Sequence, residues 1–252
     1  MNEIKLSYKD NARYFNPIRK AILNYEMIRP NEKVAIGMSG GKDSTSLLFF
    51  LDELKRHKRL GFDFEIVPIC LDMGLPVDIT PMKEFVENLG YTLEIVPTNI
   101  MEVVFDIRKE RSPCSLCAKL RRGILYSRAK ELGCSKVALG HHLDDAIETH
   151  FMNFFFHGQM GSFDPISYLS KTDISLIRPM VYVAEGDIIQ FVKRQGLPVI
   201  QNPCPVDKHT KREEIKHVVT QLSTSYPDVR QKFIMAMEKG ETEVFWKKLK
   251  KV

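Results

Sequence analysis

The sequence predicts an α/β fold in which a parallel, Rossmann-like sheet is flanked by helices on both faces. Short apolar runs alternate along the chain with helix-like segments, which is the pattern of parallel sheets. The runs are continuously apolar rather than alternating, as expected of strands that are buried on both faces. The sharpest polar motifs follow directly after two of these runs, where parallel sheets bind their ligands.

Each element follows from its own pattern. Apolar runs predict strands at residues 34–38, 64–71, 92–96, 136–139 and 174–177. Helices are expected at 43–57, 82–89 and 114–132, the last ended by Gly133, and from the fourth strand to about residue 156. The glycine- and serine-rich stretch from Gly158 to Lys171 is expected to be a mobile loop. We expect one domain over 1–252, with helical extensions over 1–30 and 184–252.

Composition restricts the class of protein. A chain of 252 residues with 44% hydrophobic and 27% charged residues is globular rather than disordered. No apolar run approaches the roughly 20 residues of a membrane span, and residues 1–20 are polar, so a cytoplasmic protein is expected. Five cysteines in that reducing compartment indicate metal binding or catalysis. A net charge of +5 suits an RNA partner, although many unrelated proteins are as basic.

A glycine-rich turn follows the first predicted strand and opens a helix. Glycines let the backbone approach an anion, and the helix N-terminus presents unpaired N–H groups, so the turn is typical of a phosphate cradle. It is not a Walker A loop, because Gly37 is one residue too close and an aspartate follows the lysine. An ordinary glycine turn with a helix cap is the alternative. The turn comprises Ser39, Gly40, Gly41, Lys42, Asp43 and Ser44.

A second polar motif ends the fourth predicted strand. Asp145 and Thr149 share one face of the following helix, as do Asp144 and Glu148. Carboxylates and imidazoles at a strand end can bind Mg²⁺ or transfer protons. Surface acids favoured by the helix dipole are the alternative. The motif runs Gly140, His141, His142, Leu143, Asp144 and Asp145.

The cysteines fall into two groups. Cys114 and Cys117 form a C-x-x-C pair at a helix start, where two thiolates can bind one metal centre. Cys204 lies between two prolines in a rigid loop and is the natural third ligand. Cys70 and Cys134 are expected to be core or near-surface residues without a ligand role.

These motifs together resemble a known family. The succession SGGKDS and GHHLDD resembles the PP-loop ATPases, which cleave ATP between the α- and β-phosphates to adenylylate a substrate oxygen. The block from Pro113 to Tyr126 (PCSLC, then LRRGILY), with Arg178-Pro179 and Cys204 after it, is similar to tRNA 2-thiocytidine synthetase, an iron–sulfur tRNA sulfurtransferase. The resemblance extends from the first helix to the Tyr226-Pro227 segment.

The resemblance implies an activity and its cofactors. Sulfur would replace the C2 oxygen of a tRNA pyrimidine, an anticodon-loop cytidine, with ATP, Mg²⁺ and a 4Fe-4S cluster. It also implies a sulfur donor, either sulfide or a cysteine desulfurase, and a homodimer. Asp207 stands where the related enzymes have a further cysteine, so a persulfide role at that position is excluded. By resemblance, the cluster ligands are Cys114, Cys117 and Cys204; ATP contacts Ser39, Gly40, Gly41, Lys42, Asp43, Ser44, Asp72, Gly140 and His141; and the catalytic residues are Lys42, Asp145 and Arg121.

Basic residues near the cysteines are candidates for RNA contacts. We expect Arg122, Lys208, Lys211 and Arg212 to hold tRNA phosphates while the base enters the site, the alternative being a solvated helix face. The Phe154-Phe155-Phe156 run is expected in the core rather than as a platform for base stacking. Three rival functions stay open: a cluster-independent PP-loop ligase like lysidine synthetase, a zinc enzyme like the deazaguanine nitrile synthases, and a non-catalytic iron–sulfur RNA-binding protein.

Overall fold

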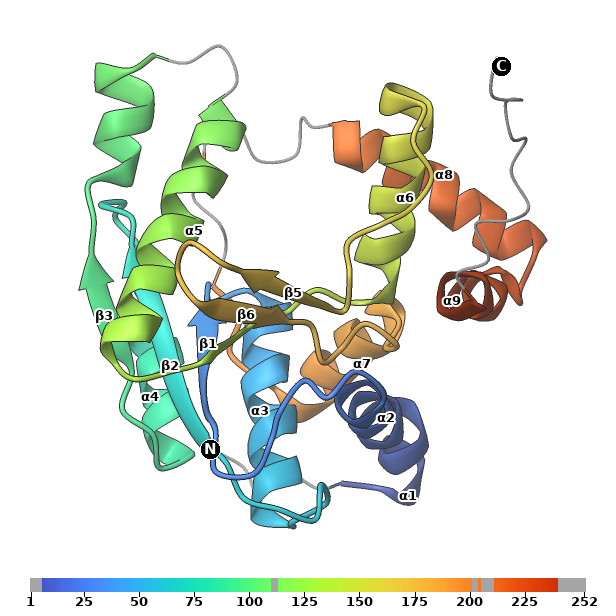
Figure 1. Ribbon diagram of the computed structural model, residues 1–252, viewed down its shortest axis with the longest axis horizontal. Coiled ribbons are helices and arrows are strands. Elements are labelled where there is room, and N and C mark those ends of the chain that lie inside the picture. Colours follow the sequence, from blue (N-terminus) through green and yellow to red (C-terminus); the bar gives the residue numbers. More distant parts are fainter. Residues whose placement is uncertain (1–5, 110–112, 201–203, 205–210, 240–252) are drawn as a thin grey trace, which may run out of the picture.

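One six-stranded sheet forms the centre of the described part of the protein (Figure 1). The computed structural model describes residues 6–109, 113–200, 204 and 211–239. Neighbouring strands run parallel except at one edge, where β5 is antiparallel to β6. From edge to edge the strands are β3 (Glu94–Pro97), β2 (Glu65–Asp72), β1 (Lys33–Met38), β4 (Lys136–Ala138), β6 (Ile174–Ile177) and β5 (Ile166–Leu169).

The central strand β1 is buried on both faces, which explains its continuous apolar sequence. Val34, Ala35 and Ile36 are all fully buried. Ile36 aligns with Pro68 of β2 on one side and with Ala138 of β4 on the other. The carboxyl ends of β1, β2 and β4 therefore meet at the same edge of the sheet, and the glycine-rich turn and the acidic motif leave from that edge.

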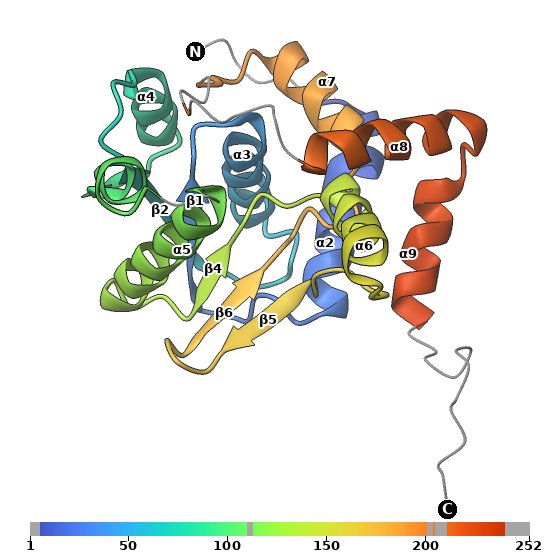
Figure 2. The ribbon, with the colours of Figure 1, turned by 90° about the horizontal axis from the view of Figure 1, so that it is seen from above.

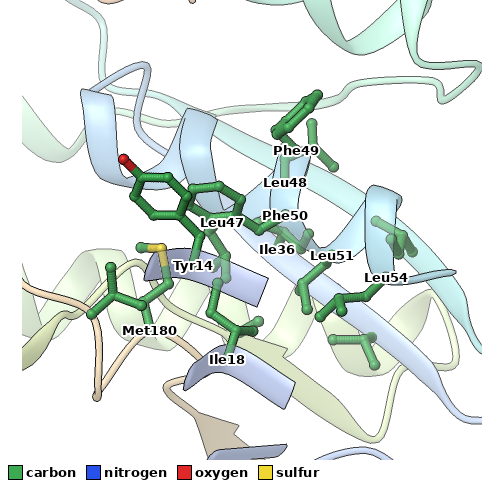
Figure 3. Packing of buried hydrophobic residues seen from close by; sticks show 14 of the residues in the cluster. Tyr14, Ile18, Ile36, Leu47, Leu48, Phe49, Phe50, Leu51, Leu54 and Met180 are labelled. Atoms are coloured by element: carbon green, nitrogen blue, oxygen red, sulfur yellow. The ribbon is translucent and has the colours of Figure 1, made fainter. Parts of the chain in front are cut away.

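One face of the sheet is covered by helices that surround α3. Phe50 of α3 is fully buried and stacks on Tyr14, with ring centroids 5.3 Å apart. Ile18 and Met180 belong to the same cluster, as Figure 3 shows. The elements on this face are α2 (Asn16–Asn24), α3 (Lys42–Arg56), α4 (Thr80–Asn88), α7 (Glu185–Gln195) and a π-helical segment, η1 (Asn11–Phe15), which follows the short α1 (Tyr8–Asp10).

The other face is covered by α5 (Pro113–Glu131). Leu125, Tyr126 and Ala129 of this helix pack on Ala35 and Val137 of the sheet. The remaining helical segment before α5 is a π-helical turn, η2 (Glu102–Ile107).

A third group of helices stands beside the sheet rather than on it. The group consists of α6 (Leu143–His157), α8 (Lys211–Ser225) and α9 (Val229–Lys239), which pack on one another (Figure 2). Its apolar contacts join Leu143 and Ile147 of α6 to Ile215 and Val219 of α8. The C-terminal helices are thereby placed against the helix that carries the acidic motif.

The expected fold class is confirmed, with one correction. Each expected strand and helix begins and ends within about two residues of its observed bounds, and the described parts of both extensions contain mainly helices. The stretch from Gly158 to Lys171 is not only a loop, because it contains β5. Ile166 of β5 pairs with Ile177 of β6, so the sheet is mixed rather than wholly parallel. Within the described ranges, no helix is long and apolar enough to cross a membrane.

Candidate functional site

The glycine-rich turn is closed by its own hydroxyl groups. Gly40 has a φ of +77°, a left-handed conformation that favours glycine, and Gly41 caps the N-terminus of α3. The buried Ser44 hydroxyl donates a hydrogen bond to the Gly41 carbonyl (3.0 Å) and accepts one from the Ser39 amide (3.2 Å). The turn is thus held with the positive end of the α3 dipole behind it, an arrangement suited to a phosphate.

A distant segment also packs on this turn. The Ile200 amide donates a hydrogen bond to the Gly40 carbonyl (2.8 Å). A Cβ atom at position 40 would lie 2.9 Å from Ile200 Cδ1, closer than real Cβ contacts allow. Gly40 is therefore required both by its backbone conformation and by this contact, which brings the chain before Cys204 to the turn.

The acidic motif lies directly against the glycine-rich turn. A Cβ atom at Gly140 would be 2.9 Å from the carbonyl carbon of Asp43, so only glycine permits this approach. His142 caps α6: its Nδ1 accepts a hydrogen bond from the Asp145 amide (3.3 Å), and Asp145 Oδ2 accepts one from the His142 amide (3.0 Å). His142 Nε2 lies 3.8 Å from Asp43 Oδ1. The two motifs form one site.

Arg212 of α8 forms ion pairs with two acidic residues of α6. Its Nη1 lies 3.2 Å from both Asp145 Oδ1 and Glu148 Oε2, and its Nη2 donates to Thr149 Oγ1 (3.4 Å). Burial and the neighbouring Asp145 raise the pKa of Glu148 to about 7, although Arg212 and Lys216 oppose the shift. The carboxylate of Asp145, the candidate catalytic or Mg²⁺ residue, is thus paired with the positive charge of Arg212 in this structure.

The adjacent Asp144 has a structural role. This buried carboxylate accepts a hydrogen bond from the Glu185 amide (2.6 Å) through Oδ2. Its Oδ1 accepts two from Arg230, at 2.8 and 2.6 Å. Asp144 ties α6 to α7 and α9 and is a positioning residue, which leaves Asp145 as the member of the pair that faces the site.

Lys42 is held by two carboxylates. Its Nζ lies 2.9 Å from Asp43 Oδ2 and 3.0 Å from Glu185 Oε1. Burial acts to lower the pKa of Lys42, but Asp43 and Glu185 outweigh it, and the pKa is raised. Glu185 also pairs with Lys216 (2.9 Å); although burial acts to raise its pKa, the two lysines lower it to about 2. Lys42 is therefore a fixed cation at the start of α3.

His141 is neutral at physiological pH. Burial lowers its pKa to about 4, against the attraction of Asp145 and with the repulsion of Arg178 and Arg212. Its Nδ1 is buried and has no hydrogen-bond partner among the residues that the structure describes. The ring packs on Phe163, with centroids 5.2 Å apart. His141 can therefore act as a neutral hydrogen-bonding group.

Three cysteines share one neighbourhood at the start of α5. Burial raises the pKa of the Cys117 thiol; Arg121 opposes this shift, and Cys204 and Cys114 add to it, which places all three thiols within electrostatic reach. Cys70 and Cys134 are buried instead, and burial raises the pKa of each to about 11. These two are core residues, as expected.

The three thiols are of the chemical type that binds an iron–sulfur cluster, but they do not lie close enough together in the structure to bind one metal centre. Three thiols with nearby positive charge are the ligands that iron clusters use. Within the described ranges, however, no three His, Cys, Asp or Glu side chains gather closely enough to hold a metal ion. The cysteines are neighbours that would have to move together to ligate.

The remaining candidates lie around this centre. Arg121 and Arg122 are exposed on α5, and the charge of Arg121 reaches both Cys117 and Cys70. Asp72 ends β2, where its Oδ1 accepts a hydrogen bond from the Gly74 amide (2.9 Å). Lys211 is exposed and pairs with Glu214 of its own helix (2.9 Å). Lys208 and Asp207 lie outside the described residues. The nucleotide and RNA roles of these residues stay predictions.

Motif reasoning did not find every residue of the site. Glu185, Ile200 and Arg230 each contact it from segments without a motif. The only sequence signal for Glu185 is its position as an acid in the first turn of a helix, which is equally typical of a simple helix cap.

Comparison with known proteins agrees with the geometry. The sequence matches the PP-loop domain family over residues 11–223. It is 38% identical over 226 residues to the tRNA-cytidine(32) 2-sulfurtransferase of Pelobacter propionicus, covering 87% of this chain and 82% of that protein. It is 34% identical to the protein of the same name from Geobacter sulfurreducens, covering 92% of both.

A solved structure shares the fold. The U34-tRNA thiolase NcsA from Methanococcus maripaludis, determined with its 4Fe-4S cluster, superposes with a TM-score of 0.74 at 23% identity, covering 93% of this chain and 80% of that one. The chain therefore belongs to the PP-loop domain family, and within it to the branch that contains the tRNA-cytidine(32) 2-sulfurtransferases.

Proposed function

We propose that this protein is an ATP-dependent tRNA sulfurtransferase that replaces the C2 oxygen of an anticodon-loop cytidine with sulfur. One observation carries the proposal: the glycine-rich turn and the acidic motif form one site at the edge of the sheet, and the segment that leads to Cys204 packs on the turn. Gly140 packs on Asp43, and Ile200 joins the turn to the segment that leads to Cys204. The relatives named tRNA-cytidine(32) 2-sulfurtransferase support the choice of base.

ATP would be held through its phosphates. The left-handed Gly40 and the N-terminus of α3 supply backbone N–H groups, and Lys42 supplies a positive charge once it releases Glu185. Mg²⁺ in such sites uses one or two carboxylates together with substrate phosphates, so a protein cage is not needed. We assign Asp43 and Asp145 to this role, because Asp43 Oδ1 is buried without a hydrogen-bond partner in the described part of the chain.

The reaction has two steps. The C2 oxygen of the base attacks the α-phosphorus of ATP, the bond to pyrophosphate breaks, and an O-adenylated base results. Sulfide then bonds to C2, and the bond between C2 and the oxygen of AMP breaks. Lys42 and the α3 dipole stabilise the negative charge that develops on the phosphates.

We assign Cys114, Cys117 and Cys204 to hold a 4Fe-4S cluster, with Arg121 as the cation beside them. A cluster with three protein ligands supplies, when bound, an iron position at which sulfide is delivered to the site. We place this chemistry in the cytoplasm, with tRNA and either sulfide or a cysteine desulfurase as partners.

The test combines metal content with product analysis. The wild type, Cys204→Ala and the control Cys134→Ala are purified without oxygen and analysed for iron and acid-labile sulfide. About four irons per chain are expected in the wild type and the control, and a loss of iron in Cys204→Ala. With ATP, tRNA and sulfide, 2-thiocytidine is expected in digested tRNA for the wild type, and none for Lys42→Gln.

Two results would contradict the proposal. Full thiolation by iron-free protein would exclude the cluster. Release of pyrophosphate that depends on tRNA, without any thiolated nucleoside, would favour a ligase of the lysidine synthetase type.

A further inference from the structure

The aromatic end of α6 is exposed, contrary to the expectation that it lies in the core. We use this name for Phe154, Phe155 and Phe156, which are 49%, 54% and 45% exposed; Met160, which follows the helix, is 53% exposed. The expectation is wrong because the residues of α6 in its apolar cluster with α8 run from Leu143 to Met152, and the three phenylalanines follow them in the last turn. The second half of the helix extends beyond the sheet (Figure 1).

This surface is ordered rather than frayed. Phe155 stacks on Phe151, with centroids 5.8 Å apart and ring planes 18° apart, and meets Phe154 edge-on at 5.4 Å. The turn after the helix is tied back, because Asn153 Nδ2 donates a hydrogen bond to the Gly161 carbonyl (3.1 Å). Exposed aromatic side chains that are held in place in this way mark an interaction site.

A lysine borders this surface, paired in the structure with Glu214 of its own helix. Lys211 Nζ lies 5.9 Å from the centre of the Phe156 ring. In Figure 1 the C-terminal end of α6 and the N-terminal end of α5, with Cys114 and Cys117, point to the same side of the molecule. Arg121 and Arg122 are exposed on α5. A ligand that bridges these two helix ends would cross the edge where the glycine-rich turn and the acidic motif lie.

We propose that the aromatic end of α6 stacks unpaired bases of the tRNA anticodon loop next to the target cytidine, with Lys211 contacting a phosphate. The inference rests on the proposed function and names the surface that holds the RNA. Aromatic rings beside lysine are the combination by which proteins bind single-stranded nucleotides, because every base offers a flat face and each nucleotide a negative charge. The net charge of +5 complements this partner.

The experiment measures binding of a fluorescent anticodon stem-loop to wild type and to a double variant, Phe155→Leu with Phe156→Leu. Leucine keeps the apolar character but lacks the flat ring, so affinity should fall about 5- to 150-fold. The pair Phe155→Tyr with Phe156→Tyr should bind within about twofold of the wild type. Tyr8→Leu, which changes an 89% exposed ring far from the site, is the matched control and should leave the affinity unchanged.

Several outcomes would overturn the inference. Unchanged affinity of the double leucine variant would do so. A change from dimer to monomer on sedimentation, with unchanged affinity per chain, would assign the surface to a second copy of the protein. If a variant does not fold, the wild type is cross-linked by ultraviolet light to a stem-loop that carries 5-iodouridine. Cross-links within residues 151–160 support the inference, and cross-links found only elsewhere refute it. A wild type that binds stem-loops but never thiolates them would refute the proposed function alone.

Discussion

Replacing Glu185 by glutamine tests the charge network that holds Lys42. Glu185 is a nearly buried carboxylate, with a side chain 13% exposed, between Lys42 at 3.0 Å and Lys216 at 2.9 Å. Its pKa falls from the ordinary 4.5 to about 2. Since one pKa unit corresponds to about 1.4 kcal/mol, the fold favours the ionised group by about 3 kcal/mol. Glutamine resembles the protonated acid, so Glu185→Gln should lower the free energy of unfolding by about that amount at pH 7.

The sign of the pH dependence follows from the direction of the shift. The folded pKa lies below the unfolded one, so the stabilisation is complete above about pH 4.5 and is lost as the pH falls towards 2. The difference between wild type and variant should therefore shrink from about 3 kcal/mol at pH 7 to about 1.5 kcal/mol at pH 3.

Urea unfolding followed by circular dichroism at several pH values measures this difference. A lowering of the melting temperature by about 6–12 °C at pH 7 should accompany it. Glu214→Gln is the matched control, because Glu214 pairs with Lys211 on the surface with 62% of its side chain exposed, and it should cost less than about 1 kcal/mol. A Glu185→Gln variant as stable as the control, or a difference that does not change with pH, would refute the reasoning.

Two further predictions concern the turn and the core. Gly40→Ala should lower both the melting temperature and the affinity for ATP more than Gly90→Ala does: both glycines have positive φ, +77° and +84°, but only at position 40 would the new Cβ meet another residue, at 2.9 Å. Thermal unfolding and nucleotide titration compare the two, and equal losses would show that the Ile200 contact is unimportant. Phe50→Ala, in the fully buried cluster with Tyr14, should lower the free energy of unfolding by about 3–5 kcal/mol in a urea titration; a loss below about 1 kcal/mol would mean that this cluster is loosely packed.

Local patterns were sufficient for most of the fold. The continuous apolar run of β1 reflects burial on both faces, and Gly133, with a φ of +77°, marks the end of α5 as its position in the sequence indicated. The β5 strand was missed because it is a four-residue edge strand with a half-exposed sequence, and its pairing with β6 is decided by the sheet.

The candidate site could also be predicted only in part from the sequence. The two motifs could be recognised from their residues, and Asp145 was expected to be the catalytic member of the acid pair, but nothing in GHHLDD indicates that Asp144 binds Arg230 while Asp145 faces Arg212. The Phe154–Phe156 run shows that residue type alone can also predict the wrong environment. Composition favours burial of three phenylalanines, while their exposure depends on how far α6 extends past its neighbours.

By itself, the sequence determined every strand of the sheet except β5, most of the helices, the glycine-rich turn and the cysteine pair, since each depends on residue spacing or on backbone preference within a few positions. Only the tertiary structure decided that Ile200 reaches Gly40 and that Glu185 holds Lys42. These contacts join residues far apart in the chain, and their free energy arises from packing and charge pairing that no local pattern records.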